Sequence, residues 1–214
     1  MNKTYITGVD KNLAHFLPWW IENIRRHDKE THITVCDYGM KTSWQSWLKT
    51  HVNHVLTYPP HPKCAWYWKP HSLLEAPYKY KCWIDIDCEV LDNMSEIFNY
   101  ADKAELGLTV DPCRRKEVEG EKWLATGVNV IKNKPKIVEQ WAKECVTSDL
   151  RGDQEVLHEI LKREPKLRKK IVEMDPKYQW LRLQLARGLD NPDKKLIHWS
   201  GPDGKRHIDQ QIRK

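Results

Sequence analysis

Short apolar segments with the composition of strands alternate along this chain with segments of helical spacing. Residues 4–9, 32–36 and 81–84 are rich in β-branched or aromatic side chains, whereas apolar residues recur at helical spacing over 16–26 and 137–145. This alternation predicts an α/β domain. Further strands are expected at 52–56, 106–110, 128–131 and 196–199, and further helices at 44–48, 69–75 and 154–161.

Length and hydropathy favour one domain over residues 1–214. With 40% hydrophobic and 31% charged residues, a chain of 214 residues buries one substantial core and is short for two. No uncharged apolar run approaches the roughly 20 residues that span a bilayer, and no secretory signal pattern is present. We therefore expect no membrane span and a cytoplasmic protein, or a domain without its membrane anchor.

Neither the cysteines nor the net charge identifies one class of binding partner. Six cysteines occur without a CxxC pair, which favours buried free thiols over a zinc cluster or a disulfide scaffold. The net charge of +6 favours polyanions, among them nucleic acids and nucleoside diphosphates. The densest basic run, residues 162–170, contains an acid and a proline, and is expected at a solvated helix end.

Two aspartates, Asp85 and Asp87, follow the apolar strand 81–84 directly. In an open α/β sheet, ligands bind beyond the carboxyl ends of the strands, where this pair is expected to lie. Two carboxylates there repel each other and lose hydration unless a cation or a proton lies between them. Mg²⁺ or Mn²⁺ suits such oxygen ligands and also binds phosphate oxygens. Taken alone, the pair is better explained, without any ligand, as turn aspartates at a strand end.

The surroundings of this pair extend the motif. Residues 81–91, running on to 98, resemble the signature of GT-A-fold glycosyltransferases, closest to the glycogenin-like family 8 enzymes. Four more segments resemble family motifs in the same order: 68–73, 126–130, 152–157 and 198–201, the last followed by Lys205. The resemblance covers nearly the whole chain and implies a single GT-A, Rossmann-like domain with a mixed, mainly parallel central sheet flanked by helices.

The resemblance also implies a function: a metal-dependent transfer of a hexose from a UDP-sugar, with retention, to a hydroxyl acceptor that stays unassigned. Asp85, Asp87 and His198 would ligate the metal, and the imidazole favours Mn²⁺ over Mg²⁺. Lys69 would contact the donor from the start of its helix. Lys205, in a Gly-rich loop, would meet the diphosphate. Residues 1–100 would bind the nucleotide, 101–200 the sugar and the acceptor, and 201–214 would form a basic tail.

Asp153 and Gln154 are the expected catalytic pair, with Asp153 on the sugar hydroxyls or an oxocarbenium-like centre and Gln154 at the anomeric face. The remaining donor contacts implied are Thr7, Gly8, Val9, Asp10, Ile86, Asp111, Thr126, Gly127 and Gly201. Most of the eleven tryptophans are expected in the core, and Trp123, Trp180 and Trp199 are candidate platforms for a sugar ring.

Simpler explanations exist for several of these residues. Asp153 is also a good helix N-cap, Asp111 a good turn residue before proline, and His198 a hydrogen-bonded core or edge residue. Lys205 is equally expected as a mobile surface side chain. Ala125 departs from the family, which has asparagine there, so that one donor-sugar contact is in doubt.

Three rival functions follow from the same residues. A metal-dependent phosphohydrolase would use Asp85 as nucleophile, but its pattern wants Thr or Val where Glu89 stands. A basic nucleic-acid module would bind with steep salt dependence, and no recognisable motif supports it. A protein of this fold that binds sugar nucleotides without turnover is the third.

Overall fold

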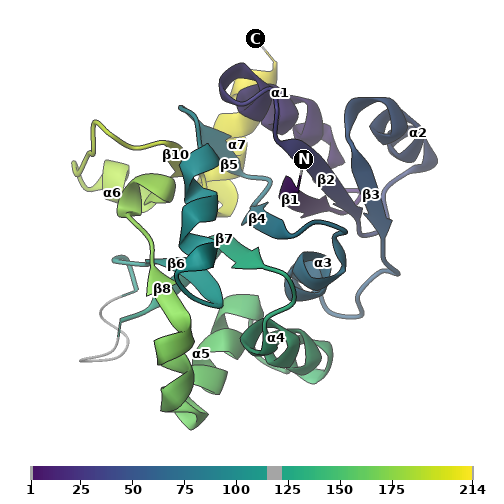
Figure 1. Ribbon diagram of the computed structural model, residues 1–214. Helices are drawn as coiled ribbons and strands as arrows, with labels where there is room; N and C mark the ends of the chain where they lie inside the picture. Colours follow the sequence, from purple (N-terminus) through teal and green to yellow (C-terminus); the bar gives the residue numbers. More distant parts are fainter. Residues whose placement is uncertain (1, 115–121, 214) are drawn as a thin grey trace.

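The computed structural model describes residues 2–114 and 122–213, and it contains the expected α/β architecture (Figure 1). Within these residues the central sheet has seven strands in the order β3-β2-β1-β4-β7-β6-β8. Neighbouring strands run parallel except at β7, which is antiparallel to both β4 and β6. The prediction of a mixed, mainly parallel sheet is confirmed.

The elements follow the sequence closely. The strands of the central sheet are β1 (Lys3–Val9), β2 (His32–Asp37), β3 (His54–Thr57), β4 (Tyr80–Ile84), β6 (Leu106–Val110), β7 (Leu124–Lys132) and β8 (Ile171–Glu173). A second sheet of three strands contains β5 (Cys88–Val90), β10 (Leu196–His198) and β9 (Trp180–Leu181). The helices are α1 (Leu17–His27), α2 (Thr42–His51), α3 (Lys69–Glu75), α4 (Lys136–Thr147), α5 (Asp153–Arg163), α6 (Arg182–Ala186) and α7 (Gly201–Ile212). No helix in the described ranges is both long and apolar enough to cross a bilayer.

Alternate residues of the central strands belong to two different core clusters. Tyr5 and Cys82 pack with α1, whereas their neighbours Ile6 and Trp83 pack with α3, α4 and α5. Because successive side chains of a strand point to opposite faces, the two clusters lie on the two sides of the sheet. Figure 1 shows α1 on one side and α4 and α5 on the other. Helices therefore cover both faces and leave the carboxyl edge of the parallel strands for a site.

The carboxyl ends of β1 and β4 meet at this edge. The two strands are parallel neighbours, with Tyr5 opposite Cys82, although they lie far apart in the sequence. Strand order reverses at β1, because β2 and β3 lie on one side of it and β4 on the other. Such a switch point leaves a crevice in which open α/β sheets bind their ligands. Asp85 follows β4 directly into this crevice.

The segment expected as a Gly-rich loop and a basic tail is a helix, and this expectation was wrong. Helix α7 begins at Gly201 and carries Pro202 in its first turn, where a missing N–H costs nothing. Ile208 is fully buried, and Gly204 packs against the backbone of Trp199. Packing of these two residues against the domain outweighs the turn signal of the glycines and the proline.

Replacing Gly204 by alanine tests this packing. A Cβ there would lie 1.9 Å from the carbonyl oxygen of Trp199. Helix propensity alone predicts a gain of about 1 kcal/mol, whereas overpacking predicts a loss of about 1–3 kcal/mol in the free energy of unfolding. We expect the loss, measured by urea denaturation. Gln210→Ala, on the exposed side of α7, is the matched control; stabilisation of both variants would contradict the packing of α7.

Candidate active site

A cavity of about 560 Å³ opens at the carboxyl ends of β1 and β4. This volume is in the range of small-molecule sites. The predicted site residues that line it are Gly8, Val9, Asp10, Lys69, Asp85, Ile86, Asp87, Thr126, Gly127, Asp153, Gln154, His198 and Lys205. A second hollow, about 640 Å³, is lined by residues 91, 92, 175, 177 and 191–195 and contains none of them.

Asp85 is held in the turn that connects β4 to β5. Its backbone N–H donates to the carbonyl of Gly127 (2.8 Å), and its own carbonyl accepts from the indole of Trp20 (3.2 Å). The Oδ1 atom accepts from the indole N–H of Trp83 (2.6 Å) and lies 3.1 Å from Lys69 Nζ. The other oxygen, Oδ2, is left to face His198 Nε2 at 3.8 Å.

The two carboxylate oxygens of Asp87 also have different partners: one contacts a lysine, and the other faces His198. Oδ2 accepts from Lys205 Nζ (2.9 Å), and Oδ1 lies 3.2 Å from His198 Nε2. Burial opposes the charge on Asp87, but the charges of His198 and Lys205 outweigh it and hold the pKa of this carboxyl well below its ordinary value. Burial likewise opposes the charge on His198, and the carboxylates of Asp87 and Asp85 raise the pKa of its imidazole.

These contacts leave His198 Nε2 facing one oxygen of each aspartate, Asp85 Oδ2 at 3.8 Å and Asp87 Oδ1 at 3.2 Å. Two anionic oxygens and one imidazole nitrogen form a donor set that fits Mn²⁺ well and Mg²⁺ less well. Lys69 already contacts Asp85 Oδ1, and Lys205 already contacts Asp87 Oδ2. The other oxygen of each aspartate is therefore the one available to a cation.

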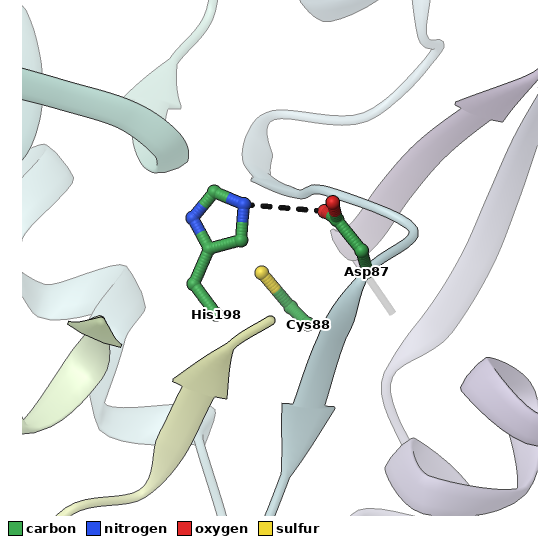
Figure 2. Close-up of side chains that lie close together, drawn as sticks. All are labelled: Asp87, Cys88 and His198. Atoms are coloured by element: carbon green, nitrogen blue, oxygen red, sulfur yellow. Dashed lines mark ion pairs between the residues drawn. The ribbon is translucent and has the colours of Figure 1, made fainter. Parts of the chain in front are cut away.

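Cys88 is a neighbour of this set that the sequence analysis did not consider. It lies opposite His198 in the pairing of β5 with β10. Its Sγ lies within 4.8 Å of donor atoms of Asp87 and His198. Figure 2 shows the three side chains close together. Burial raises the pKa of this thiol well above its ordinary value. The neutral thiol is a poor ligand for Mn²⁺, so Asp85 is retained as the third predicted ligand.

Lys69 lies between two carboxylates from different parts of the chain. Its side chain is 3% exposed, and its Nζ lies 3.1 Å from Asp85 Oδ1 and 3.2 Å from Asp153 Oδ2. It also donates to the carbonyl of Thr126 (3.1 Å). Burial disfavours the ammonium, but Asp153 and Asp85 reverse this and hold the pKa of Lys69 above its ordinary value.

Asp153 is not the N-cap of its helix. Gly152 occupies the cap position, and Asp153 is the first residue of α5 with its side chain turned towards β7, where Thr126 Oγ1 donates to Oδ2 (2.9 Å). Burial, together with the charge of Asp85, raises the pKa of Asp153 despite Lys69. The neighbouring Gln154 lines the cavity, and its buried Nε2 has no hydrogen-bond partner in the described part of the chain. An amide donor without a partner is available to a ligand.

Gln179 positions His198, and the sequence analysis missed it. It is 3% exposed, and its amide oxygen accepts from the backbone N–H of Val128 (2.8 Å) and from Thr109 Oγ1 (3.2 Å). The amide nitrogen therefore faces His198 Nδ1 at 3.2 Å, which turns Nε2 towards Asp87. Gly127 leaves room for the ring, since a Cβ there would lie 2.6 Å from its Cε1 and Nδ1. No motif around residue 179 signals this role, because it depends on a long-range contact.

Some predicted contacts lie outside the cavity lining. Thr7 is buried within β1 and Gly201 begins α7, and neither lines the cavity. Asp111 accepts from the backbone N–H of Cys113 (2.9 Å), as a turn aspartate does. Ala125 is buried in β7 and does not line the cavity either.

The tryptophan candidates are elsewhere too. Trp123 stacks on His158, and Trp199 stacks on His207 and donates to Glu89 Oε2 (2.7 Å). Trp180 is half-buried in β9. The lining of the cavity includes a different indole, that of Trp66.

Removing the cation at position 69 tests the buried triad. Lys69→Met leaves Asp85 and Asp153 facing each other without a counter-ion, and breaking a buried pair in this way costs about 3–5 kcal/mol. We expect this loss in the free energy of unfolding at pH 7 and a smaller one in acid, where Asp153 binds a proton. Lys122→Met, which breaks the exposed pair with Glu173, is the control and costs less than about 1 kcal/mol. Equal effects of the two substitutions would contradict the triad.

The pH dependence of metal binding follows from His198. The pKa of its imidazole is raised, and a proton on Nε2 competes with a metal ion. Below this pKa, the affinity for Mn²⁺ should fall by about tenfold per pH unit, and above it the affinity should level off. Calorimetric titration with Mn²⁺ at several pH values measures this. His198→Gln should remove the dependence, whereas His15→Gln, at an exposed histidine, should not; a profile unchanged in His198→Gln would exclude the histidine.

Comparison with known proteins identifies solved structures of similar fold. No family model matches the sequence, and no curated protein matches it. The crystallised galactosyltransferase LgtC, in complex with donor and acceptor sugar analogs, is 14% identical, with a TM-score of 0.69 over 98% of this chain and 95% of LgtC. The apo form of the bifunctional glycosyltransferase WbbM is 12% identical (TM-score 0.64; 98% of this chain, 51% of WbbM). The apo form of the glycosyltransferase GlyE of Streptococcus pneumoniae TIGR4 is 13% identical (TM-score 0.68; 95% of this chain, 55% of GlyE). The chain thus has the GT-A fold of these glycosyltransferases.

Proposed function

We propose that this protein is a metal-dependent glycosyltransferase that moves a hexose from a sugar nucleotide to a hydroxyl acceptor. One observation carries the proposal: His198 Nε2 faces a carboxylate oxygen of Asp85 and one of Asp87 beside Lys205, in the cavity at the carboxyl edge of the sheet. The shared fold with LgtC, WbbM and GlyE supports it.

We assign the donor as a UDP-hexose and the metal as Mn²⁺. The segment Gly8 to Asp10 lines the cavity at the end of β1 and would contact the nucleotide. Lys205 is half-buried at 2.9 Å from Asp87, and it would meet the diphosphate next to the metal. LgtC, a galactosyltransferase crystallised with donor and acceptor sugar analogs, supports a nucleotide-sugar donor.

The bound metal would neutralise the charge that develops on the leaving diphosphate. Lys205 would add a fixed positive charge from the side of α7. Asp153, anchored by Lys69 and Thr126, would accept hydrogen bonds from the sugar hydroxyls. Gln154 would turn its unpartnered amide towards the anomeric face. Retention of configuration stays an implication of the family resemblance, and a cytoplasmic location stays a prediction.

The phosphohydrolase alternative is less well supported by the geometry. A nucleophilic Asp85 needs an accessible oxygen with no competing partner. Its Oδ1 is held by Trp83 and Lys69, and its Oδ2 faces His198. The arrangement suits a ligand of a cation better than a nucleophile.

A donor screen tests the proposal. UDP and a panel of UDP- and GDP-hexoses are added to the protein with and without Mn²⁺, and thermal unfolding and donor hydrolysis are followed. We expect stabilisation by UDP only when Mn²⁺ is present. Asp87→Asn should lower turnover by more than about 100-fold, since a metal contributes several kcal/mol to stabilising the leaving group.

Asp209→Asn is the control for this substitution, because it removes a carboxylate outside the cavity that pairs with His15. Absence of stabilisation by every nucleotide tried would refute the proposal. Mn²⁺-dependent binding without any hydrolysis or transfer would point instead to a protein that binds sugar nucleotides without turnover.

A further inference from the structure

The cavity continues past the proposed donor site. Beyond Asp153 and Gln154 it is lined by the segment that leads into α3 and by the start of α5, with Trp66, Arg151 and Glu155 among its residues. A transferase must bring a second substrate to the anomeric carbon, and the opposite end is taken by the metal ligands and Lys205. If the proposed function holds, this end receives the acceptor.

Trp66 is the exposed aromatic residue of this end. It belongs to the 3-10 helix Ala65–Trp68, and 52% of its surface is accessible. Its indole edge lies over Gly152, where a Cβ would be 3.5 Å from Nε1. Within the described ranges its Nε1 donates no hydrogen bond. A bare ring face next to an N–H donor matches the C–H face and the hydroxyl edge of a pyranose.

Cations line the cavity, and all but one of those described form an ion pair. Lys69 and Lys205 pair with the carboxylates of the metal site, and His198 faces the same pair. At the far end Arg114 pairs with Glu155 (2.5 Å), and Lys63 pairs with Asp149.

Arg151 is the exception: across residues 2–114 and 122–213 its guanidinium forms no ion pair. It is exposed in the cavity lining and directly precedes Gly152, the glycine over which the indole of Trp66 lies. A guanidinium presents a planar fork that binds a carboxylate or a phosphate with two hydrogen bonds. An acidic group on the acceptor would bind this guanidinium as its counter-ion.

We infer that the acceptor is a saccharide that carries an acidic group, with its ring stacked on Trp66 and its carboxylate or phosphate on Arg151. The two residues act together: the indole recognises a sugar ring of any charge, and the guanidinium selects the acidic one. Glu155 does not oppose this selection, because Arg114 neutralises it.

Direct binding measurements test the inference without knowledge of the donor. The full chain with UDP and Mn²⁺ is titrated with methyl β-glucuronide, methyl β-glucoside and glucose 6-phosphate, and tryptophan fluorescence and ligand-observed NMR report the affinity. We expect the glucuronide or the phosphate to bind at least about tenfold more tightly than the neutral glucoside. The comparison of the two acidic sugars distinguishes a carboxylate from a phosphate.

Substitutions separate the two contributions. Trp66→Ala should abolish measurable binding of all three sugars, whereas Trp66→Phe, which keeps an aromatic face, should retain most of it. Arg151→Ala should remove the preference for acidic sugars and leave the weak binding of the glucoside. Trp44→Ala and Arg26→Ala, which change a tryptophan and an arginine outside the cavity, are the controls and should bind like the wild type. Circular dichroism verifies that each variant is folded.

Equal affinity for the acidic and neutral sugars, or a preference that survives Arg151→Ala, would overturn the inference. Failure of the proposed function looks different: the wild type would then show no Mn²⁺-dependent binding of UDP. If acidic sugars still bound through Trp66 and Arg151 in that case, their recognition would stand as a property of the cavity alone.

Discussion

The buried ammonium of Lys69 is the contact on which the rest of the site depends. It lies between Asp85, at the end of β4, and Asp153, at the start of α5, and is itself 3% exposed. Two carboxylates this close in a region of low dielectric would repel each other, and burial alone already raises the pKa of Asp153. The cation between them attracts both carboxylates and offsets this repulsion. The contact thereby joins the two halves of the chain that were expected to bind the nucleotide and the sugar.

A single row of alternating basic and acidic side chains follows from this contact. Lys69, Asp85, His198, Asp87 and Lys205 come from four separate segments, yet neighbours in the row lie 2.9–3.8 Å apart. The outer lysines occupy one oxygen of each aspartate and orient the other towards the imidazole. Such preorganisation suits the proposed function, because fixed charges stabilise a departing diphosphate without reorienting during the reaction.

How much of this was accessible from the sequence depends on whether the signal is local. The strands and long helices were predicted because their periodicity is local, and Asp85-Ile86-Asp87 was found because it follows an apolar strand. The two- and three-residue strands β8 and β9 and the five-residue α6 are too short to show a period. Gln179 was missed because its partner His198 is 19 residues away. Helix α7 was missed because Gly201, Pro202 and Gly204 carry turn signals that packing overrides.

Substrate selection is the property least accessible to a motif, and the structure explains why. Counting charges in the sequence gives many candidate cations, whereas what matters for a ligand is which of them lacks a counter-ion. Arg114 and Arg151 look alike in the sequence, but only folding brings Glu155 to the first of them. Trp66 and Gly152 are likewise brought into contact by the packing of α4 against both α5 and the segment before α3. The proposed metal site is found in sequence motifs because its residues would contact one fixed group. The proposed acceptor end depends instead on which charged side chain the fold leaves without a counter-ion.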